Sequence, residues 1–168
     1  MFTRIIVPLD GSELAEQALP QAEELARLTN APIHLVRIID IGNPGQYGAY
    51  LALEAAGYAE ALERDEAESA VYLKEMGRHL ADRGHSVAVE HQRGHPAQEL
   101  VALTRPDDLL VMATHGRGGV GRALLGSVAD EVVRHAQVPV LLVRASARQG
   151  ARPQSAEKPL TAVGYEPW

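Results

Sequence analysis

Short apolar runs alternate with longer amphipathic segments along most of this chain. Four of the runs are dense in Val, Ile and Leu, and another alternates apolar and polar positions, which is typical of strands in a buried sheet. These runs are residues 4–10, 33–39, 86–92, 109–113 and 139–144. The segments between them repeat apolar residues every three or four positions, which predicts helices. We expect helices over residues 13–28, 58–83 and 128–135, and another that starts at Pro96.

This alternation predicts a doubly wound α/β fold, in which a parallel sheet carries helices on both faces. Asp10 or Ser12 is expected to cap the first helix, and Pro20 is expected to kink it. Pro96 suits the first position of a helix, where a missing N–H loses no hydrogen bond. The long helix is expected to turn six positions inward: Leu62, Ala70, Leu73, Met76, Gly77 and Leu80.

Length and composition indicate one domain followed by a tail. A chain of 168 residues, 46% of them hydrophobic, can bury one sizeable core. We expect the folded domain to span residues 1–144. Residues 145–168 shift toward Arg, Gln, Ser, Pro and Gly, and we expect this tail to be disordered.

Charge and cysteine content narrow the classes of function. The formal net charge is −6, and the basic residues are dispersed, so a nucleic-acid partner is not expected. The absence of cysteine excludes disulfides, thiolate metal sites and cysteine nucleophiles. The first residues lack a secretory apolar segment, and no window is long and apolar enough for a membrane span. We therefore expect a cytoplasmic protein that does not enter a membrane.

Five glycines and two arginines lie in the stretch over residues 113–127, directly after the fourth predicted strand. In open α/β sheets, ligands bind beyond the carboxyl ends of the strands. Glycines let backbone N–H groups approach a ligand, and the amino end of the following helix adds partial positive charge. The stretch therefore predicts a site for phosphate oxygens.

Two common phosphate-binding motifs do not explain this stretch. A Walker A loop requires a Gly-Lys pair, which the sequence lacks. The letters Gly-x-Gly-x-x-Gly do occur from Gly116 to Gly121. A dinucleotide fingerprint, however, follows the first strand and has an acidic residue about twenty positions later, where this chain has Ala136.

Two segments, residues 5–12 (IIVPLDGS) and residues 112–144, together resemble the universal stress protein family. The resemblance implies the strand order 3-2-1-4-5 in a five-stranded sheet. The nucleotide-binding branch of that family carries Gly-x-x-Gly, nine residues, and then Gly-Ser or Gly-Thr. Here the second glycine is Gly116 and the closing pair is Gly126 and Ser127, while Ala113 stands in the first position.

The resemblance further implies a site for ATP, with Mg²⁺ or Mn²⁺ as a companion of the phosphates. Pro8, Leu9 and Asp10 would line the base and ribose, and the backbone of Ile38 would contact the adenine edge. Gly116 and Arg117 would meet the phosphates. The complete set of nucleotide-binding residues expected from the resemblance is Pro8, Leu9, Asp10, Ile38, Met112, Ala113, His115, Gly116, Arg117, Gly126, Ser127 and Val128.

Several of these residues also have simpler structural interpretations. Asp10 and Ser127 could each only cap a helix. His115 could be a general base, although a lone histidine beside a glycine-rich loop is more often structural. His91 and His95 are expected to be solvated histidines near a turn and not metal ligands, because Glu90 should face away from His91.

The resulting hypothesis is a protein of the stress response that senses or switches on adenine nucleotide. No dedicated catalytic residue or metal ligand is expected, and the carboxylates of residues 60–68 are expected to form a solvated helix face. One alternative is a member that binds no nucleotide and acts through dimerisation and protein partners, which Ala113 favours. Another is a slow nucleotide hydrolase that uses His115. The last strand, which starts at Pro139 and ends at Arg144, would be a hydrophobic sheet edge and is expected to pair with its copy in a homodimer.

Overall fold

Five parallel strands form one sheet in the computed structural model of this protein. The structure describes residues 1–42, 51–114 and 125–145, apart from the side chains of residues 51–56 and 58. The strands are β1 (Arg4–Pro8), β2 (Ile33–Asp40), β3 (Val87–Gly94), β4 (Asp108–Ala113) and β5 (Val140–Val143). Their order is β3-β2-β1-β4-β5, and every neighbouring pair is parallel. The predicted fold class and strand order are confirmed.

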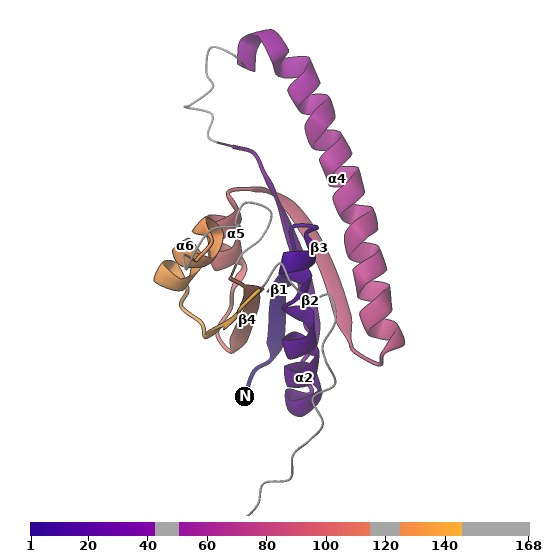
Figure 1. Ribbon diagram of the computed structural model, residues 1–168, viewed down its shortest axis with the longest axis vertical. Coiled ribbons are helices and arrows are strands. Elements are labelled where there is room, and N and C mark those ends of the chain that lie inside the picture. Colours follow the sequence, from indigo (N-terminus) through magenta and orange to yellow (C-terminus); the bar gives the residue numbers. More distant parts are fainter. Residues whose placement is uncertain (43–50, 115–124, 146–168) are drawn as a thin grey trace, which may run out of the picture.

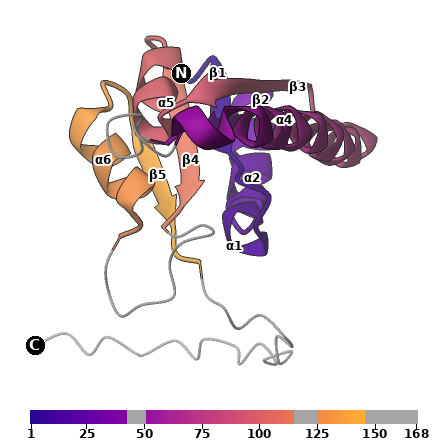
Figure 2. The same cartoon turned by 90° about the horizontal axis from the view of Figure 1, so that it is seen from above.

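Helices cover both faces of this sheet (Figures 1 and 2). They are α1 (Glu13–Glu16), α2 (Leu19–Thr29), α4 (Leu51–Asp82), α5 (Pro96–Leu103) and α6 (Ser127–His135). The helices α1, α2 and α4 pack on one face, and α5 and α6 pack on the other. Among the described residues, no helix combines the length and the apolar character that crossing a membrane requires.

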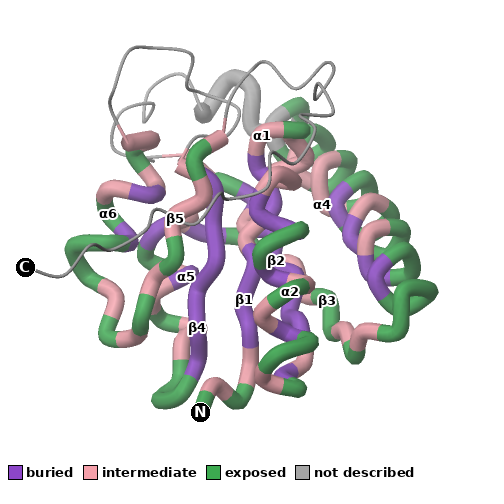
Figure 3. The backbone as a smooth tube through the Cα atoms, turned by 60° about the horizontal axis from the view of Figure 1, so that its bottom comes forward, coloured by how far each residue is buried: buried purple, intermediate pink, exposed green. Residues whose placement is uncertain are grey.

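The two-residue period of the central strands divides the core between these faces. Ile5 and Val7 of β1 belong to the cluster beneath α1, α2 and α4, whereas Ile6 belongs to the cluster beneath α5 and α6. All three are 0% exposed. Figure 3 shows β1 and β4 buried along nearly their whole length. Strands covered on both faces need apolar residues at consecutive positions, which explains the apolar runs in the sequence.

The first predicted helix is in fact two helices. The helix α1 ends at Glu16, and α2 begins at Leu19 with Pro20 in its first turn. Proline is tolerated in the first turn of a helix but not in its interior, so the helix is interrupted before Pro20 instead of being kinked at it. Ser12 caps α1 as predicted, because its Oγ accepts a hydrogen bond from the Ala15 N–H at 3.2 Å.

The long helix α4 begins at Leu51, earlier than the predicted start at residue 58. Six positions of α4 were predicted to face inward, and the prediction is wrong for Ala70, which is exposed. Ser69 is buried in its place, and its Oγ donates to the Asp65 carbonyl one turn back. That local bond satisfies the buried hydroxyl. The other five predicted positions are buried or half-buried: Leu62, Leu73, Met76, Gly77 and Leu80.

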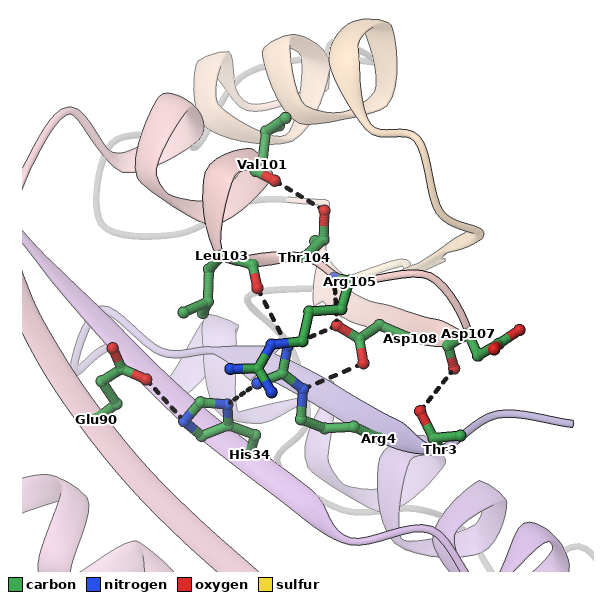
Figure 4. A network of polar contacts seen from close by, with 10 residues as sticks. All are labelled: Thr3, Arg4, His34, Glu90, Val101, Leu103, Thr104, Arg105, Asp107 and Asp108. Carbon is green, nitrogen blue, oxygen red and sulfur yellow. Dashed lines mark hydrogen bonds and ion pairs between the residues drawn. The ribbon is translucent and has the colours of Figure 1, made fainter.

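A polar network joins the beginnings of β1 and β4 (Figure 4). The Arg4 guanidinium donates to Asp108 Oδ2 from Nη2 at 2.6 Å and to Oδ1 from Nε at 3.1 Å. Its Nη1 lies 3.2 Å from His34 Nδ1. Because arginine has no acceptor, His34 Nδ1 must accept, so Nε2 carries the proton and donates to Glu90 at 3.1 Å. This network lies at the opposite end of the strands from the carboxyl-terminal edge.

Candidate functional site

A notch opens in the carboxyl-terminal edge of the sheet because β1 ends before its neighbours. The pairing of β1 with β2 ends at Pro8 and Val36, whereas the pairing of β2 with β3 continues to Asp40 and Gly94. On the other side, the pairing of β4 with β5 also continues, to the last residue of β4. The chain leaves β1 toward one face of the sheet and β4 toward the other. This is the topological switch point at which α/β proteins bind ligands.

A cavity of about 450 Å³ occupies this notch, a size that suits a small-molecule ligand. All the described residues that the sequence assigned to a nucleotide site line it. They are Pro8, Leu9, Asp10, Ile38, Met112, Ala113, Gly126, Ser127 and Val128. The other three predicted residues, His115, Gly116 and Arg117, lie outside the described residues. Sequence positions from β1, β2, β4 and α6 thus meet at one place.

Asp10 forms the turn between β1 and α1. Its Oδ1 accepts hydrogen bonds from the Ser12 N–H at 2.9 Å and from the Ser12 hydroxyl at 2.6 Å. The intervening Gly11 has a φ of 79°, a left-handed conformation that glycine adopts without strain. Ser12 therefore caps the helix, and Asp10 orients Ser12.

The amino end of α6 forms another wall of the cavity. Gly126 is its N-cap and Ser127 is its first helical residue, so the interpretation of Ser127 as the cap is wrong. The Gly126 N–H donates to the Thr114 carbonyl at 2.8 Å, which ties the start of α6 to the end of β4. Among the described residues no side chain caps this helix end. Its first N–H groups and the helix dipole therefore suit an anion.

Three charged residues on the β2 side of the cavity were not predicted from the sequence: Arg37, Asp40 and Asp65. Arg37 Nη2 donates to Asp65 Oδ1 at 2.8 Å, and the Arg37 side chain is only 6% exposed. Its guanidinium carbon lies 5.8 Å from the centre of the Tyr72 ring, a cation–π distance. The available signal was an arginine within a predicted strand, between Val36 and Ile38. A buried charge needs a partner, and the partner is on α4.

The expectation of a solvated carboxylate face on α4 is only partly right. Glu60, Glu63 and Glu68 are exposed as predicted. Asp65 instead pairs with Arg37, and Glu66 pairs with Arg93 of β3. These two carboxylates therefore tie α4 to the sheet.

Tyr72 links Arg37 to α1. Its hydroxyl donates to Glu16 Oε1 at 2.8 Å. Burial, together with the hydrogen bond to Glu16, raises the pKa of Tyr72 well above its usual range. The hydroxyl therefore stays protonated, and it remains a donor that holds α4 against α1.

His91 and His95 lie on different elements. His91 belongs to β3, and its Nε2 lies 3.9 Å from Glu66 Oε1 of α4. Glu90 faces His34 on the other side of the strand, as predicted. His95 precedes α5 as its N-cap residue. Within the part of the chain that the structure describes, no three potential metal-ligating side chains come together.

Comparison with known proteins identifies the family. The model of the universal stress protein family matches residues 1–144. This chain belongs to that family. A universal stress protein of Methanocaldococcus jannaschii is 31% identical over 149 residues, which cover 86% of this chain and 83% of the relative.

Solved structures of universal stress proteins share the fold. That of UspA from Lactobacillus plantarum has a TM-score of 0.73 and 23% identity, covering 85% of this chain and 98% of that one. One solved in complex with cAMP has a TM-score of 0.58 and 24% identity, covering 86% of this chain and 98% of that one. One from Arabidopsis thaliana with AMP bound has a TM-score of 0.59 and 17% identity, covering 86% of this chain and 93% of that one. At these identities the likeness shows the fold alone.

Proposed function

We propose that this universal stress protein binds an adenine nucleotide, ATP with Mg²⁺ or Mn²⁺, in the cavity beyond β1. In this proposal the protein is cytoplasmic, and the presence or absence of bound nucleotide makes it a sensor or switch in the stress response. One observation carries the proposal. Every described residue that the family motif assigns to the nucleotide lines the same cavity, although these residues come from four separate elements.

The chemistry of the cavity fits a nucleotide from end to end. Ile38, Pro96 and Leu100 provide apolar surface for a base, and Asp10 provides an acceptor for ribose hydroxyls. The amino end of α6, which no side chain of the described residues caps, suits phosphate oxygens. Asp10, Asp40 and Asp65 outnumber Arg37 among the described charged lining residues, so a divalent cation would help to offset the charge of a triphosphate. The relatives that were solved with cAMP and AMP support an adenine nucleotide as the ligand.

Calorimetric titration tests this proposal. ATP with Mg²⁺ is titrated into the full chain after carried-over nucleotide has been stripped, and the expected Kd is on the order of micromolar. Gly126→Val should abolish binding, because it adds a branched side chain to the cavity wall at the start of α6. The φ of Gly126 is −59°, which valine can adopt, so the variant should fold.

Gly57→Val is the matched control. Gly57 lies on the exposed face of α4, and a Cβ atom there would meet nothing within 4 Å. This variant should bind ATP like the parent. If the parent itself binds no ATP, the proposal is refuted, and a role through dimerisation and protein partners takes its place.

A further inference from the structure

The helix α4 is much longer than the strands that it covers. Its 32 residues span about 48 Å, whereas the 8 residues of β3 span about 26 Å. Figure 1 shows the amino-terminal turns of α4 extending beyond the carboxyl ends of the strands, which is the edge of the sheet that holds the cavity. The two halves of α4 therefore have different surroundings.

Apolar burial holds the carboxyl-terminal half of α4 more firmly than the amino-terminal half. Leu73 and Leu80 are each 1% exposed and belong to the core. Among the described residues of the amino-terminal segment, residues 57–68, none is buried, and Leu62 is the one half-buried apolar residue. Gly57 weakens this segment further, because glycine destabilises a helix interior. Segments with few buried apolar contacts open locally without unfolding of the whole protein.

Ion pairs tie the amino-terminal segment of α4 to the sheet. Glu66 pairs with Arg93 of β3, and Asp65 pairs with Arg37 of β2. Asp65 is also the one described residue of α4 that lines the cavity. Arg37 is only 6% exposed and lies over the Tyr72 ring, so the sheet side of this pair is fixed. Opening of the segment would withdraw Asp65 from the cavity wall and would leave a buried guanidinium without its carboxylate, which is costly.

We propose that the Arg37–Asp65 pair couples nucleotide occupancy of the cavity to the docking of the amino-terminal segment of α4 on the sheet. This inference rests on the proposed nucleotide site and supplies the element that switches. A bound nucleotide displaces water from the cavity wall, and an ion pair is stronger where water is excluded. A ligand that binds the docked state better than the open state shifts the protein toward docking. The segment therefore opens more often in the empty protein than in the nucleotide-bound protein.

Amide hydrogen exchange of the stripped full chain, with and without ATP and Mg²⁺, tests the inference. In the empty protein, the amides of residues 57–68 should exchange faster than those of residues 73–80, because they exchange through local opening. ATP at about a hundred times its Kd slows this exchange by up to about a hundredfold if the open state binds no ATP. We expect a slowing of at least about tenfold, since the open state keeps the other walls of the cavity and some affinity for ATP.

Variants of the ion pair test whether the coupling runs through it. Asp65→Asn removes the charge and keeps the shape of the side chain. In this variant, ATP at about a hundred times the variant's own Kd should slow exchange over residues 57–68 by less than about threefold. Arg37→Met with Asp65→Ala removes both charges and so avoids leaving a buried guanidinium unpaired. This double variant should lose the effect of ATP in the same way, which keeps the test valid if Asp65→Asn folds poorly.

Glu66→Gln is the matched control on the same helix. The Glu66 side chain is 39% exposed, as is that of Asp65, and it also ties α4 to a sheet arginine, but it does not line the cavity. Without nucleotide, this variant should exchange faster over residues 57–68 than the parent, because it has lost one tie. ATP should still slow its exchange by at least about tenfold.

The outcomes separate this inference from the proposed function. Exchange over residues 57–68 that is no faster than over residues 73–80 in the empty protein overturns the inference, because the segment then has no local opening. ATP that binds in calorimetry but leaves the exchange of the segment unchanged also overturns it. A tenfold slowing that survives in either folded variant of the ion pair does so too, because the coupling then runs elsewhere. Absence of ATP binding by the parent in calorimetry refutes the proposed function, and the inference falls with it.

Discussion

Replacing Asp108 with asparagine should destabilise the fold by about 3 kcal/mol at pH 7. The Asp108 side chain is 2% exposed, and its carboxylate accepts from Arg4 and from the Arg105 N–H, the latter at 2.7 Å. Asparagine keeps the shape but removes the charge and turns one acceptor into a donor that faces the guanidinium. Removing one partner of a buried ion pair costs about 3 to 5 kcal/mol. Arg4 is 16% exposed and keeps its bond to the Leu103 carbonyl, which favours the lower end.

The pH dependence of this loss gives a second signature. Burial alone raises the pKa of Asp108, but the hydrogen bonds from Arg4 and the Arg105 backbone outweigh it, so the pKa lies below its usual value. A depressed folded-state pKa stabilises the fold above the unfolded pKa, about 4, and this contribution is lost as the pH falls through the folded pKa. The difference between the parent and Asp108→Asn should therefore be complete at neutral pH and shrink below about pH 4.

Urea unfolding of both proteins, followed by circular dichroism between about pH 2.5 and 7, measures this difference. Asp130→Asn is the control, because Asp130 pairs with Arg134 on the exposed side of α6 and should contribute little. An Asp108→Asn loss below about 1 kcal/mol with unchanged m, or a loss independent of pH, would show that the network is not an energetically significant ion pair.

Two further predictions concern His34 and the sheet edge. Burial and the nearby Arg4 lower the pKa of His34 despite Glu90, so the folded state favours the neutral imidazole. The stability that this preference contributes is complete above about pH 6.5, and it declines as the pH falls toward the folded pKa. His34→Gln should remove that decline, and a free-energy difference from the parent that stays constant from about pH 7.5 to 5 would contradict the assignment. We also propose a homodimer through β5, an edge strand whose Leu141 is 36% exposed. Sedimentation should then show a dimer for the parent and a monomer for Leu141→Arg, and a monomeric parent would refute it.

The fold was predictable because its signals are local. Apolar runs and helical periodicity each depend on a few consecutive residues. The apolar runs predicted every strand, whereas the periodicity merged α1 and α2 into one helix. The boundaries were harder, because they reflect competing local preferences. The long helix was predicted to start at residue 58, yet Leu51, Ala52 and the residues around them are strong helix formers, and α4 runs through Gly57 from Leu51.

The charged wall of the cavity was not predictable by the same means. Asp65 and Arg37 are 28 positions apart, and nothing local distinguishes Asp65 from Glu63 or Glu68, which are exposed. Only the packing of α4 on β2 decides which carboxylate meets the buried arginine. Ser69 illustrates the same limit, since its burial depends on the rotation of α4 about its axis, while Ala70 was the more apolar choice.

The structure also clarifies what the alanine in the family motif changes. Ala113 is the last residue of β4 and pairs with Val143 in the sheet. The described non-glycine residues with positive φ are Asn30 and Asp107, so the backbone at Ala113 has no conformation that requires glycine. The effect of Ala113 on a ligand therefore reduces to the space taken by one methyl group. That group belongs to a residue only 7% exposed at the cavity wall. ATP binding by the parent would show that the cavity accommodates this methyl, whereas its absence would identify Ala113 as the first position to change back to glycine.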